Sequence, residues 1–325
     1  MIGKVDPDSL ASLVLGRTGA PDERVLQGPA YGEDTAAIRL EGGAEEGILV
    51  VNADPISLAV GRVGSLGVDV AANDVAASGA TPEWLTSVVL LPGSDDALDT
   101  ITAQLDEAAR RLGVAIVGGH SEYAPALSTP MLVLTCFGLT DRYVPTGGAE
   151  PGDRILLTKG AGIEATAILA TDFRDRLDGR VPEALLESAE GFYDEVSVVP
   201  EAAVLREYAN AMHDPTEGGL VDGLLELATA SGVRIEVDPG AIPIREETRR
   251  LCEAVGVDPL RTFGSGALLA AVPEASTDEA LSALDEVGIE AAVVGTVEEG
   301  DGPALALGEE TFDEPVRDDM YALWE

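Results

Sequence analysis

Apolar runs alternate with segments of helical periodicity along the first half of the chain. Runs typical of buried strands lie at 48–54, 84–91 and 131–139, and the run at 114–122 predicts a strand that ends in a turn. Residues 95–112 place apolar side chains at helical spacing, with Asp, Gln, Glu and Arg on the outer face. Strands and helices that alternate with short connections predict an α/β domain.

A segment rich in glycine and proline, residues 143–153, is the best candidate for a domain boundary. After it the pattern restarts, with a strand and turn at 154–160 followed by further helices and strands. We therefore expect an α/β (α+β) protein of two domains, one over residues 1–142 and the other over residues 150–325.

The stretch 61–80 predicts a helix that is buried on nearly all sides. Its first three glycines recur at every third residue and several alanines follow them, and small residues at helical spacing let another backbone approach closely. The helix also carries Asp69, Asn73 and Asp74, which are costly to bury without partners. Two interpretations stay open: a solvated acidic face, or an edge that faces a cation bound beside phosphates.

The charge balance is strongly acidic. The 325 residues include 20 Lys and Arg against 59 Asp and Glu, which gives a net charge of −39, and Lys4 and Lys159 are the only lysines. This composition resembles that of proteins from halophilic archaea that accumulate salt. Molar salt shortens the Debye length to about 3 Å and screens the self-repulsion of such a chain. We expect folding to require high salt.

The composition also argues against several classes of protein. No basic patch is present to neutralise nucleic-acid phosphates or to bind an anionic membrane. The apolar runs fall far short of the roughly 18 residues that span a bilayer, and the N-terminus lacks a signal-peptide pattern. Cys136 and Cys252 are isolated, so neither a zinc site nor a disulfide is expected. We expect a cytoplasmic protein with no nucleic-acid or membrane partner.

Four acidic turns supply the candidate chemistry. They are Gly32–Asp34, Ala53–Asp54, Asn73–Asp74 and His213–Gly219. In so acidic a chain each turn alone is explained by solvation. Together they predict a site in which Asp34, Asp54 and Asp74 offer oxygen ligands to a divalent cation bound with nucleotide phosphates. Backbone N–H groups of the glycine turns would hold phosphate oxygens.

Lys159 and the two histidines are further candidates. Lys159 lies at a junction of strand, turn and helix, but the glycine patterns typical of phosphate-binding loops are absent. A phosphate contact and a structural anchor stay open for it. His120 and His213 lie beside glycine turns, where general acid–base catalysis is one interpretation.

Six motifs, taken in order, resemble those of the aminoimidazole ribonucleotide (AIR) synthase superfamily. They are GEDTAAI, VNADP, VDVAANDVAASGATP, VGGHSE, LLTKGAGIEATAILA and MHDPTEGGL, and the resemblance covers nearly the whole chain, from about Gly32 to the strand near Val272. The hydrogenase expression/formation (maturation) proteins are the most similar branch, whereas thiamine-monophosphate kinase and selenophosphate synthetase are more distant. The ordered set is specific, although each motif alone is not.

The resemblance implies a fold, a cofactor and a set of site residues. An AIR synthase-like N-terminal domain would form a barrel with the same domain of a second subunit, and an AIR synthase-like C-terminal α/β domain would follow it. ATP and Mg²⁺ would bind between the domains, with Asp34, Asp54 and Asp74 on the metal and phosphate side. The other implied positions are Gly32, Asn73 and Gly119 in the first domain, Lys159 and Gly160 in the turn that opens the second, and Asp214, Thr216 and Gly218 in the turn that faces the nucleotide or acceptor.

Several departures from the family pattern bear on activity. Gly119-His120-Ser121 replaces the usual turn with an acidic residue, although Glu122 could substitute. Glu217 stands where the maturation proteins carry arginine. The chain ends in RDDMYALWE, without the cysteine that receives the carbamoyl group in those proteins, and no cysteine precedes the first acidic turn. We therefore expect neither cyanide-ligand synthesis in its usual form nor selenophosphate synthesis.

The function expected from this resemblance is ATP- and Mg²⁺-dependent phosphoryl transfer by a homodimer. The acceptor would be an oxygen, often of a carbonyl or amide, on an unidentified small molecule or protein. Asp214, Lys159 and His120 are the candidate catalytic residues, and a plain helix cap is the alternative role of Thr216. The competing hypotheses are a nucleotide-binding accessory protein without turnover and a kinase of a small metabolite.

Overall fold

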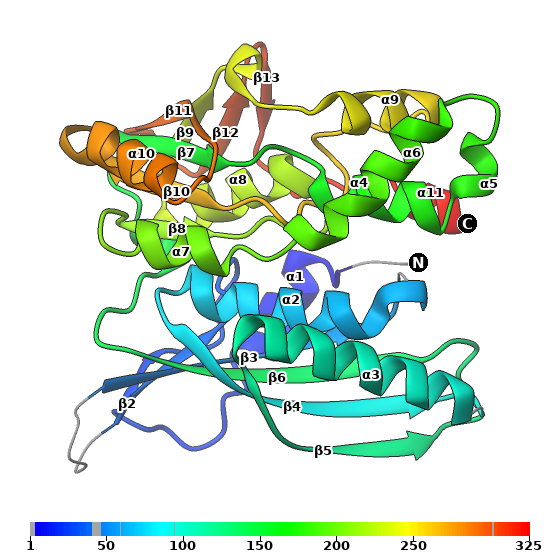
Figure 1. Cartoon of the computed structure of the whole chain (residues 1–325). Helices are drawn as coiled ribbons and strands as arrows, with labels where there is room; N and C mark the ends of the chain where they lie inside the picture. The colour runs from blue at the N-terminus through cyan, green and yellow to red at the C-terminus, as the bar shows by residue number, and fades with distance from the viewer. Residues whose placement is uncertain (1–3, 41–46, 59, 94, 301) are drawn as a thin grey trace.

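The computed structural model describes residues 4–40, 47–58, 60–93, 95–300 and 302–325. Figure 1 shows two α/β halves, one above the other, with the N-terminal half in blue to green below and the C-terminal half above. Helices α2 (Val63–Ala77) and α7 (Val199–Leu205) contact each other where the two halves meet. The chain therefore has the two α/β halves that the sequence predicts (Figure 1).

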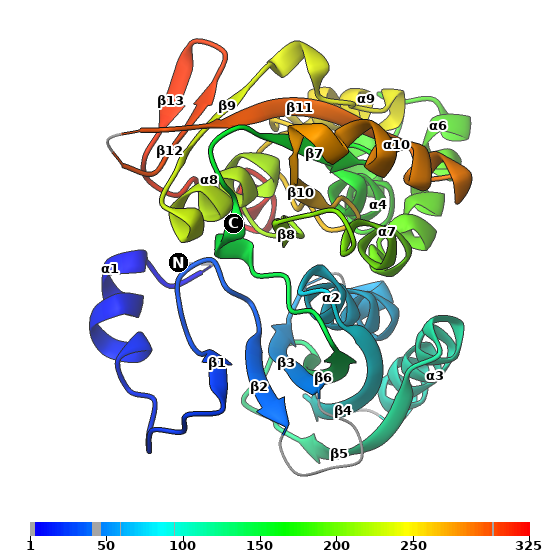
Figure 2. The same cartoon turned by 90° about the vertical axis from the view of Figure 1, so that its left-hand side faces the viewer.

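The N-terminal half contains a six-stranded sheet in the order β1-β2-β3-β6-β4-β5. Its strands are β1 (Val25–Gln27), β2 (Ala36–Leu40), β3 (Gly47–Ile56), β4 (Thr81–Leu91), β5 (Ala115–Tyr123) and β6 (Met131–Thr140). Only the pair β4–β5 is parallel among these neighbours. Every second residue of β6 is buried, because helices α2 and α3 (Asp95–Leu112) cover one face of the sheet (Figure 2).

Helix α2 is buried along nearly its whole length, as its small residues predict. A Cβ atom at Gly67 would lie 2.6 Å from Leu134 Cδ1 of β6, and one at Gly64 would lie 2.6 Å from Ile101 O of α3. Real Cβ atoms do not approach other atoms so closely, so the glycines allow the sheet and the second helix to pack against α2. This packing fixes the position of the polar residues that α2 carries.

Strand β5 differs from the sequence-based expectation. The turn expected in the 114–122 segment is wrong, because Gly119 and His120 continue the strand by pairing with Ser87 and Val88 of β4. The strand therefore extends to Tyr123, and all nine of its residues are exposed. It forms the edge of the sheet, with one side of its backbone open to a further strand.

The C-terminal half contains a seven-stranded sheet in the order β13-β12-β9-β11-β7-β10-β8. Its strands are β7 (Asp153–Thr158), β8 (Ala211–His213), β9 (Arg234–Val237), β10 (Leu269–Pro273), β11 (Ala291–Glu298), β12 (Ala304–Leu307) and β13 (Glu310–Phe312). Helix α1 (Pro7–Leu10) precedes the first sheet. The α-helices of the C-terminal half are α4 (Ile163–Thr171), α5 (Arg174–Leu177), α6 (Glu183–Glu190), α7, α8 (Gly219–Ser231), α9 (Glu246–Val255), α10 (Thr277–Glu286) and α11 (Tyr321–Trp324). Among the described helices, none is both long and apolar enough to cross a membrane.

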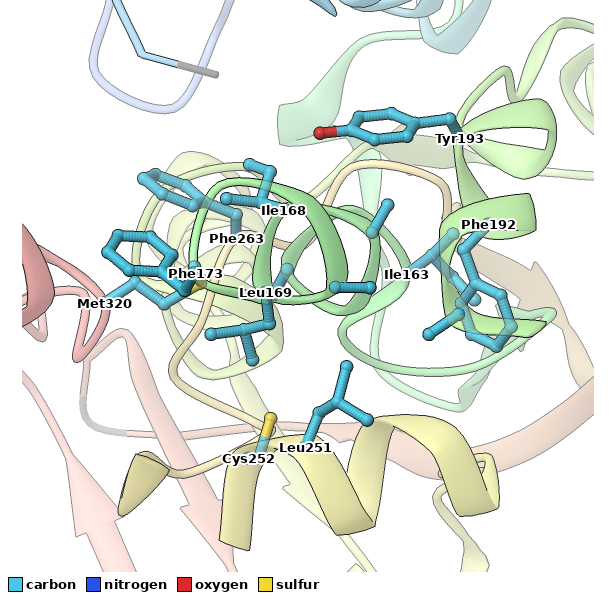
Figure 3. Packing of buried hydrophobic residues seen from close by; sticks show 14 of the residues in the cluster. Ile163, Ile168, Leu169, Phe173, Phe192, Tyr193, Leu251, Cys252, Phe263 and Met320 are labelled. Atoms are coloured by element: carbon cyan, nitrogen blue, oxygen red, sulfur yellow. The ribbon is translucent and has the colours of Figure 1, made fainter. Parts of the chain in front are cut away.

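One of the two large clusters of buried apolar residues in this half surrounds helix α4. Ile163, Ile168 and Leu169 of α4 contribute to it, together with Phe192 before α7 and Leu251 of α9 (Figure 3). The C-terminal segment closes the cluster, since Met320 and Tyr321 are buried in it. The last residues of the chain are therefore part of the core of the second domain.

Candidate functional site

Four aspartates from both domains lie close together. Asp34 follows the turn at Gly32, Asp54 lies on β3, Asp74 lies on α2, and Asp214 directly follows β8. Asn52, two residues before Asp54 on the same face of β3, donates its amide to Asp74 Oδ2 at 2.6 Å and to Asp54 Oδ2 at 3.3 Å. We call Asp34, Asp54, Asp74 and Asp214 the aspartate cluster.

Burial and mutual repulsion disfavour the ionised forms of carboxylates in the aspartate cluster. Burial, followed by the charges of Asp214 and Asp54, raises the pKa of Asp74 well above its usual value. Burial and the charge of Asp34 raise the pKa of Asp214 to about 8. Asp214 is 1% exposed and its Oδ2 atom has no hydrogen-bond partner. A bound cation would relieve both the repulsion and the missing contact.

Asp34 lies at the solvent side of the cluster, because 44% of its side chain is exposed. Its pKa is raised, chiefly because protein replaces part of the surrounding water. His213 Nδ1 lies 3.4 Å from Asp34 Oδ2, and His213 Nε2 lies 2.9 Å from Glu226 Oε2. Burial disfavours a charged imidazole, but the bond to Glu226 and the charge of Asp34 outweigh it and raise the pKa of His213 to about 9.

Glu226 of α8 links this histidine to the N-terminal segment. Its Oε1 atom accepts a hydrogen bond from Lys4 Nζ at 2.8 Å. Burial would raise the pKa of Glu226, but the Lys4 charge and the contacts with His213 lower it to about 2. Charges therefore alternate in sign from Lys4 through Glu226 and His213 to Asp34, which orients the side chain of His213 beside the cluster.

Asn73 contacts the second domain and not the neighbouring Asp74. Its amide donates to Val196 O at 2.9 Å, and its Oδ1 atom accepts from Val198 N at 2.8 Å. Both polar groups of this buried side chain are thus used in holding the loop before α7 against α2. Asp74 is positioned by the same contact, because it is the next residue of the helix.

Lys159 holds the same loop from the other side. Its Nζ atom donates to Glu195 O and Ser197 O, each at 2.8 Å, and lies 2.7 Å from Glu201 Oε1. The structure therefore shows an anchoring contact for Lys159, one of the two roles that the sequence left open. Gly160 is also tightly enclosed, since a Cβ atom there would lie 2.7 Å from Pro243 O.

His120 and Gly119 are not brought to the aspartate cluster within this single chain. His120 lies on the exposed strand β5 with its side chain 66% exposed, and its Nε2 atom is 3.2 Å from Glu122 Oε2. Gly119 faces β4, where a Cβ atom would lie 2.1 Å from Ser87 O. The close approach of β4 leaves no room for a side chain at position 119, which explains the glycine there.

The turn after β8 brings Thr216 and Gly218 near Asp214. Helix α8 begins at Gly219, and its N-cap position is Gly218, with no side-chain cap. Thr216 therefore does not act as a helix cap. Its carbonyl oxygen accepts from Gly219 N and Gly264 N, and both Gly218 and Gly32 adopt positive φ angles that favour glycine.

Sequence reasoning missed three residues that support the site. Asn52 could have been found, because it shares a strand face with Asp54. Glu226 could have been suspected as an acid within an apolar helix. Glu33 holds the linker between the domains, since its carboxylate accepts from Gly147 N at 2.9 Å and Thr146 N at 3.3 Å.

The donor chemistry of the aspartate cluster suits a hard cation. Carboxylate and amide oxygens are the ligands that Mg²⁺ prefers, usually with water completing its shell. Within the described ranges, no group of three or more His, Cys, Asp or Glu side chains is preassembled as a metal site. Mg²⁺ that is bound to substrate phosphates needs only one or two carboxylates from the protein, so a preassembled site is not required.

The architecture of two α/β domains with acidic groups of both at their junction agrees with matches to two family models. Residues 32–140 match the model of the AIR synthase related protein, N-terminal domain, and residues 150–308 match that of its C-terminal domain. The chain belongs to the AIR synthase-related family.

Proteins involved in hydrogenase maturation are among the similar relatives. The chain is 32% identical over 281 residues to the carbamoyl dehydratase HypE of Cupriavidus necator, which covers 82% of this chain and 77% of that protein. It is 34% identical over 261 residues to the hydrogenase expression/formation protein HupE of Azotobacter chroococcum, covering 75% and 72%. The predicted similarity to hydrogenase-maturation proteins is confirmed.

Solved structures show the same fold. The HypE structure from E. coli superposes with a TM-score of 0.71 at 27% identity, over 83% of this chain and 87% of that one. A ThiL structure complexed with AMPPCP and TMP gives a TM-score of 0.71 at 22% identity, over 87% and 89%. These superpositions confirm the expected AIR synthase-like fold.

Proposed function

We propose that this protein transfers the γ-phosphoryl group of Mg²⁺-bound ATP to an oxygen atom of a small acceptor. The bond from the γ-phosphorus to the bridging oxygen would break, a bond to the acceptor oxygen would form, and ADP would leave. The observation that carries the proposal is the aspartate cluster, where Asp214 of the second domain keeps a buried oxygen without a partner. The named activities of the relatives, carbamoyl dehydratase and thiamine monophosphate kinase, fit the same reaction class.

Each residue of the site has a distinct part in this proposal. Asp34, Asp54 and Asp74 would hold Mg²⁺, which supplies neutralisation of phosphate charge. Asn52 keeps two of these carboxylates in register through its amide. Asp214 would orient the acceptor from the second domain. We assign Lys159 and Asn73 to holding the loop at 195–198, and not to the chemistry.

The direct experiment is a thermal-shift measurement with ATP alone, Mg²⁺ alone and both together. A ligand at about 100 times its Kd stabilises the folded state by about 2.7 kcal/mol. We expect a clear rise of the melting temperature only when both are present, because ATP adds negative charge to an already acidic site. An equal response to ATP without Mg²⁺ would contradict the metal assignment.

A nucleotide-binding accessory protein without turnover is the second candidate. His120, at the position of the family's acidic residue, lies on an exposed strand away from the cluster, and this observation favours it. A solved structure with this fold, at 22% identity, is that of a HypE–HypF complex, and its protein partner supports this candidate. Phosphate release by the parent protein, measured in the presence of candidate amide and carbonyl acceptors, distinguishes the two functions.

We also propose that two copies pair through strand β5. Its nine residues are all exposed, and Ile116, Val117 and Tyr123 are large apolar side chains among them. An exposed edge strand with apolar residues favours pairing with another strand. Pairing through β5 would also bury part of this apolar surface.

Val117→Arg should convert the dimer to a monomer. The substitution places a charge on each of two facing strands, and like charges at an interface oppose association. Light scattering after size-exclusion chromatography measures the mass. Val293→Arg is the matched control, because Val293 is an exposed strand valine of the other domain. A monomeric parent, or a dimeric Val117→Arg protein, would contradict the assignment.

High salt should be required for folding, as expected from the net charge of −39. Mutual repulsion of the acidic groups destabilises the compact state unless ions screen it. Circular dichroism would follow the fold as KCl falls from molar to millimolar concentration. Sucrose is the control, because it favours compact states without screening charge. Full stability in millimolar KCl would refute the screening explanation.

A further inference from the structure

The turn between β8 and α8 sets the position of Asp214. This aspartate is 1% exposed, and its Oδ2 atom has no hydrogen-bond partner. A functional side chain that its own contacts do not lock depends on the neighbouring structure for its placement. The contacts that hold the backbone at residues 214–219 therefore decide where this carboxylate lies.

Two distant segments of the chain hold this turn. Thr216 O accepts a hydrogen bond from Gly264 N at 2.9 Å, which joins the turn to the loop before β10. Gly218 N donates to Asp318 Oδ2 of the C-terminal segment at 2.9 Å. Gly218 is the N-cap residue of α8, and its helix has no local side-chain cap. Asp318, 100 positions away, therefore supplies a contact that the turn itself does not provide.

Asp318 uses both of its carboxylate oxygens. Oδ2 accepts from Gly218 N, and Oδ1 accepts from Met320 N at 2.8 Å. The side chain is buried, so water does not readily replace either bond. Burial raises the pKa of Asp318 to about 7, and the two N–H groups oppose this rise. An asparagine in the same geometry offers one acceptor oxygen and one NH₂ group, so it would turn a donor toward one of the two N–H groups.

The segment that carries Asp318 is itself fixed in the core of the second domain. Met320 and Tyr321 are buried in the apolar cluster around α4, and Figure 3 shows Met320 there. Val316 N, on the other side of Asp318 in the sequence, donates to Asp222 Oδ1 of α8 at 3.2 Å. Asp318 therefore connects the turn to a packed part of the protein and not to a loose chain end.

We propose that Asp318 is a positioning residue for the phosphoryl transfer. Through its bond to Gly218 N it fixes the turn that holds Asp214 toward the acceptor. The effect of Asp318 on turnover rests on the proposed function, whereas its effect on the turn does not. A purely structural cap of α8 is the competing role, and it would change stability without changing the rate of the folded enzyme.

Asp318→Asn should lower kcat for phosphate release from ATP and Mg²⁺ by about tenfold, with KM for ATP nearly unchanged. A small misplacement of a group that acts in the transition state lowers the rate more than ground-state binding. The assay is run at about pH 8.5, above the pKa of Asp318, so that the parent protein carries the ionised carboxylate. In an Asp214→Asn background the same substitution should change kcat by less than about twofold, because residues that act through one group are not additive.

Asp319→Asn is the matched control from the same segment. Asp319 Oδ2 accepts from Asp258 N at 3.0 Å in an exposed contact, so this variant should keep the kcat of the parent protein. Amide hydrogen exchange supplies a second measurement, in which Asp318→Asn should speed exchange at residues 214–219 but not in β7. Asp318→Ser, with a single side-chain oxygen, takes the place of Asp318→Asn if the latter does not fold, and the same results are expected.

Three results would overturn the positioning role of Asp318. They are unchanged exchange at residues 214–219, a kcat like that of the parent protein, and an equal loss of kcat with and without Asp214. A parent protein that releases no phosphate and shows no Mg²⁺-dependent ATP shift would refute the proposed function instead. The exchange measurement would then decide alone whether Asp318 holds the turn.

Discussion

Asp214→Asn should slow ATP turnover by about tenfold or more, which is about 1.4 kcal/mol of barrier, with little change in ATP affinity. Asp214 lies on the second domain, opposite the carboxylates assigned to Mg²⁺, where it would orient the acceptor. An interaction of this kind contributes more in the transition state than in ground-state binding. The measurement is steady-state phosphate release beside nucleotide affinity for both proteins.

Asp214→Asn should not lower the stability of the folded protein. The pKa of Asp214 is raised to about 8, because the folded protein disfavours the ionised carboxylate. At a pH above the pKa of Asp214 in the unfolded chain, this carboxylate therefore lowers the stability of the fold. A neutral amide of the same shape removes that destabilisation. The melting temperature should stay the same or rise. Asp175→Asn, at an exposed aspartate of α5, is the matched control. Equal turnover of the Asp214 variant and the parent would remove Asp214 from the site.

Asp74→Ala should abolish the stabilisation by ATP and Mg²⁺. The substitution removes one assigned metal ligand, and it also leaves the amide of Asn52 without its 2.6 Å contact to Asp74. That second loss lowers the stability of the ligand-free protein by about 1–3 kcal/mol. The informative quantity is therefore the change in melting temperature on adding ATP with Mg²⁺, compared with each protein's own ligand-free value.

Asp69→Asn is the control from the same helix. Asp69 is buried and pairs with Arg111 at 2.6 Å, so its replacement should destabilise the protein by breaking an ion pair between α2 and α3. It is absent from the aspartate cluster, and the response to ATP with Mg²⁺ should persist. A retained response in Asp74→Ala, or its loss in Asp69→Asn, would count against the metal assignment.

Local pattern was enough to predict the parts of the fold that depend on near neighbours. The small residues of α2 predicted its burial, and the periodicity of residues 95–112 predicted α3 with the bounds that it has. The turn at 114–122 was wrong, because pairing with β4 continues the strand through glycine and histidine. Strand pairing is a tertiary effect that local glycine content does not reveal.

The sequence predicts the four aspartates as acids of turns, and this local structure is correct for only two of them. Asp34 and Asp214 lie in irregular backbone. The turns expected at Ala53–Asp54 and Asn73–Asp74 are wrong, because Asp54 lies within strand β3 and Asp74 lies within helix α2. The contact of Lys4 with Glu226 joins residues 222 positions apart, and no local signal reports it. The loop contact of Asn73 likewise spans more than 120 positions, so its placement depends on how the two domains pack.

A crystal structure with Mn²⁺ in place of Mg²⁺ and a non-hydrolysable ATP analogue tests the central claim most directly. Anomalous scattering locates the manganese without reference to the protein chain. The account predicts metal within coordination distance of carboxylates among Asp34, Asp54 and Asp74, with the terminal phosphate directed toward Asp214. Nucleotide bound with its metal away from these aspartates would contradict it.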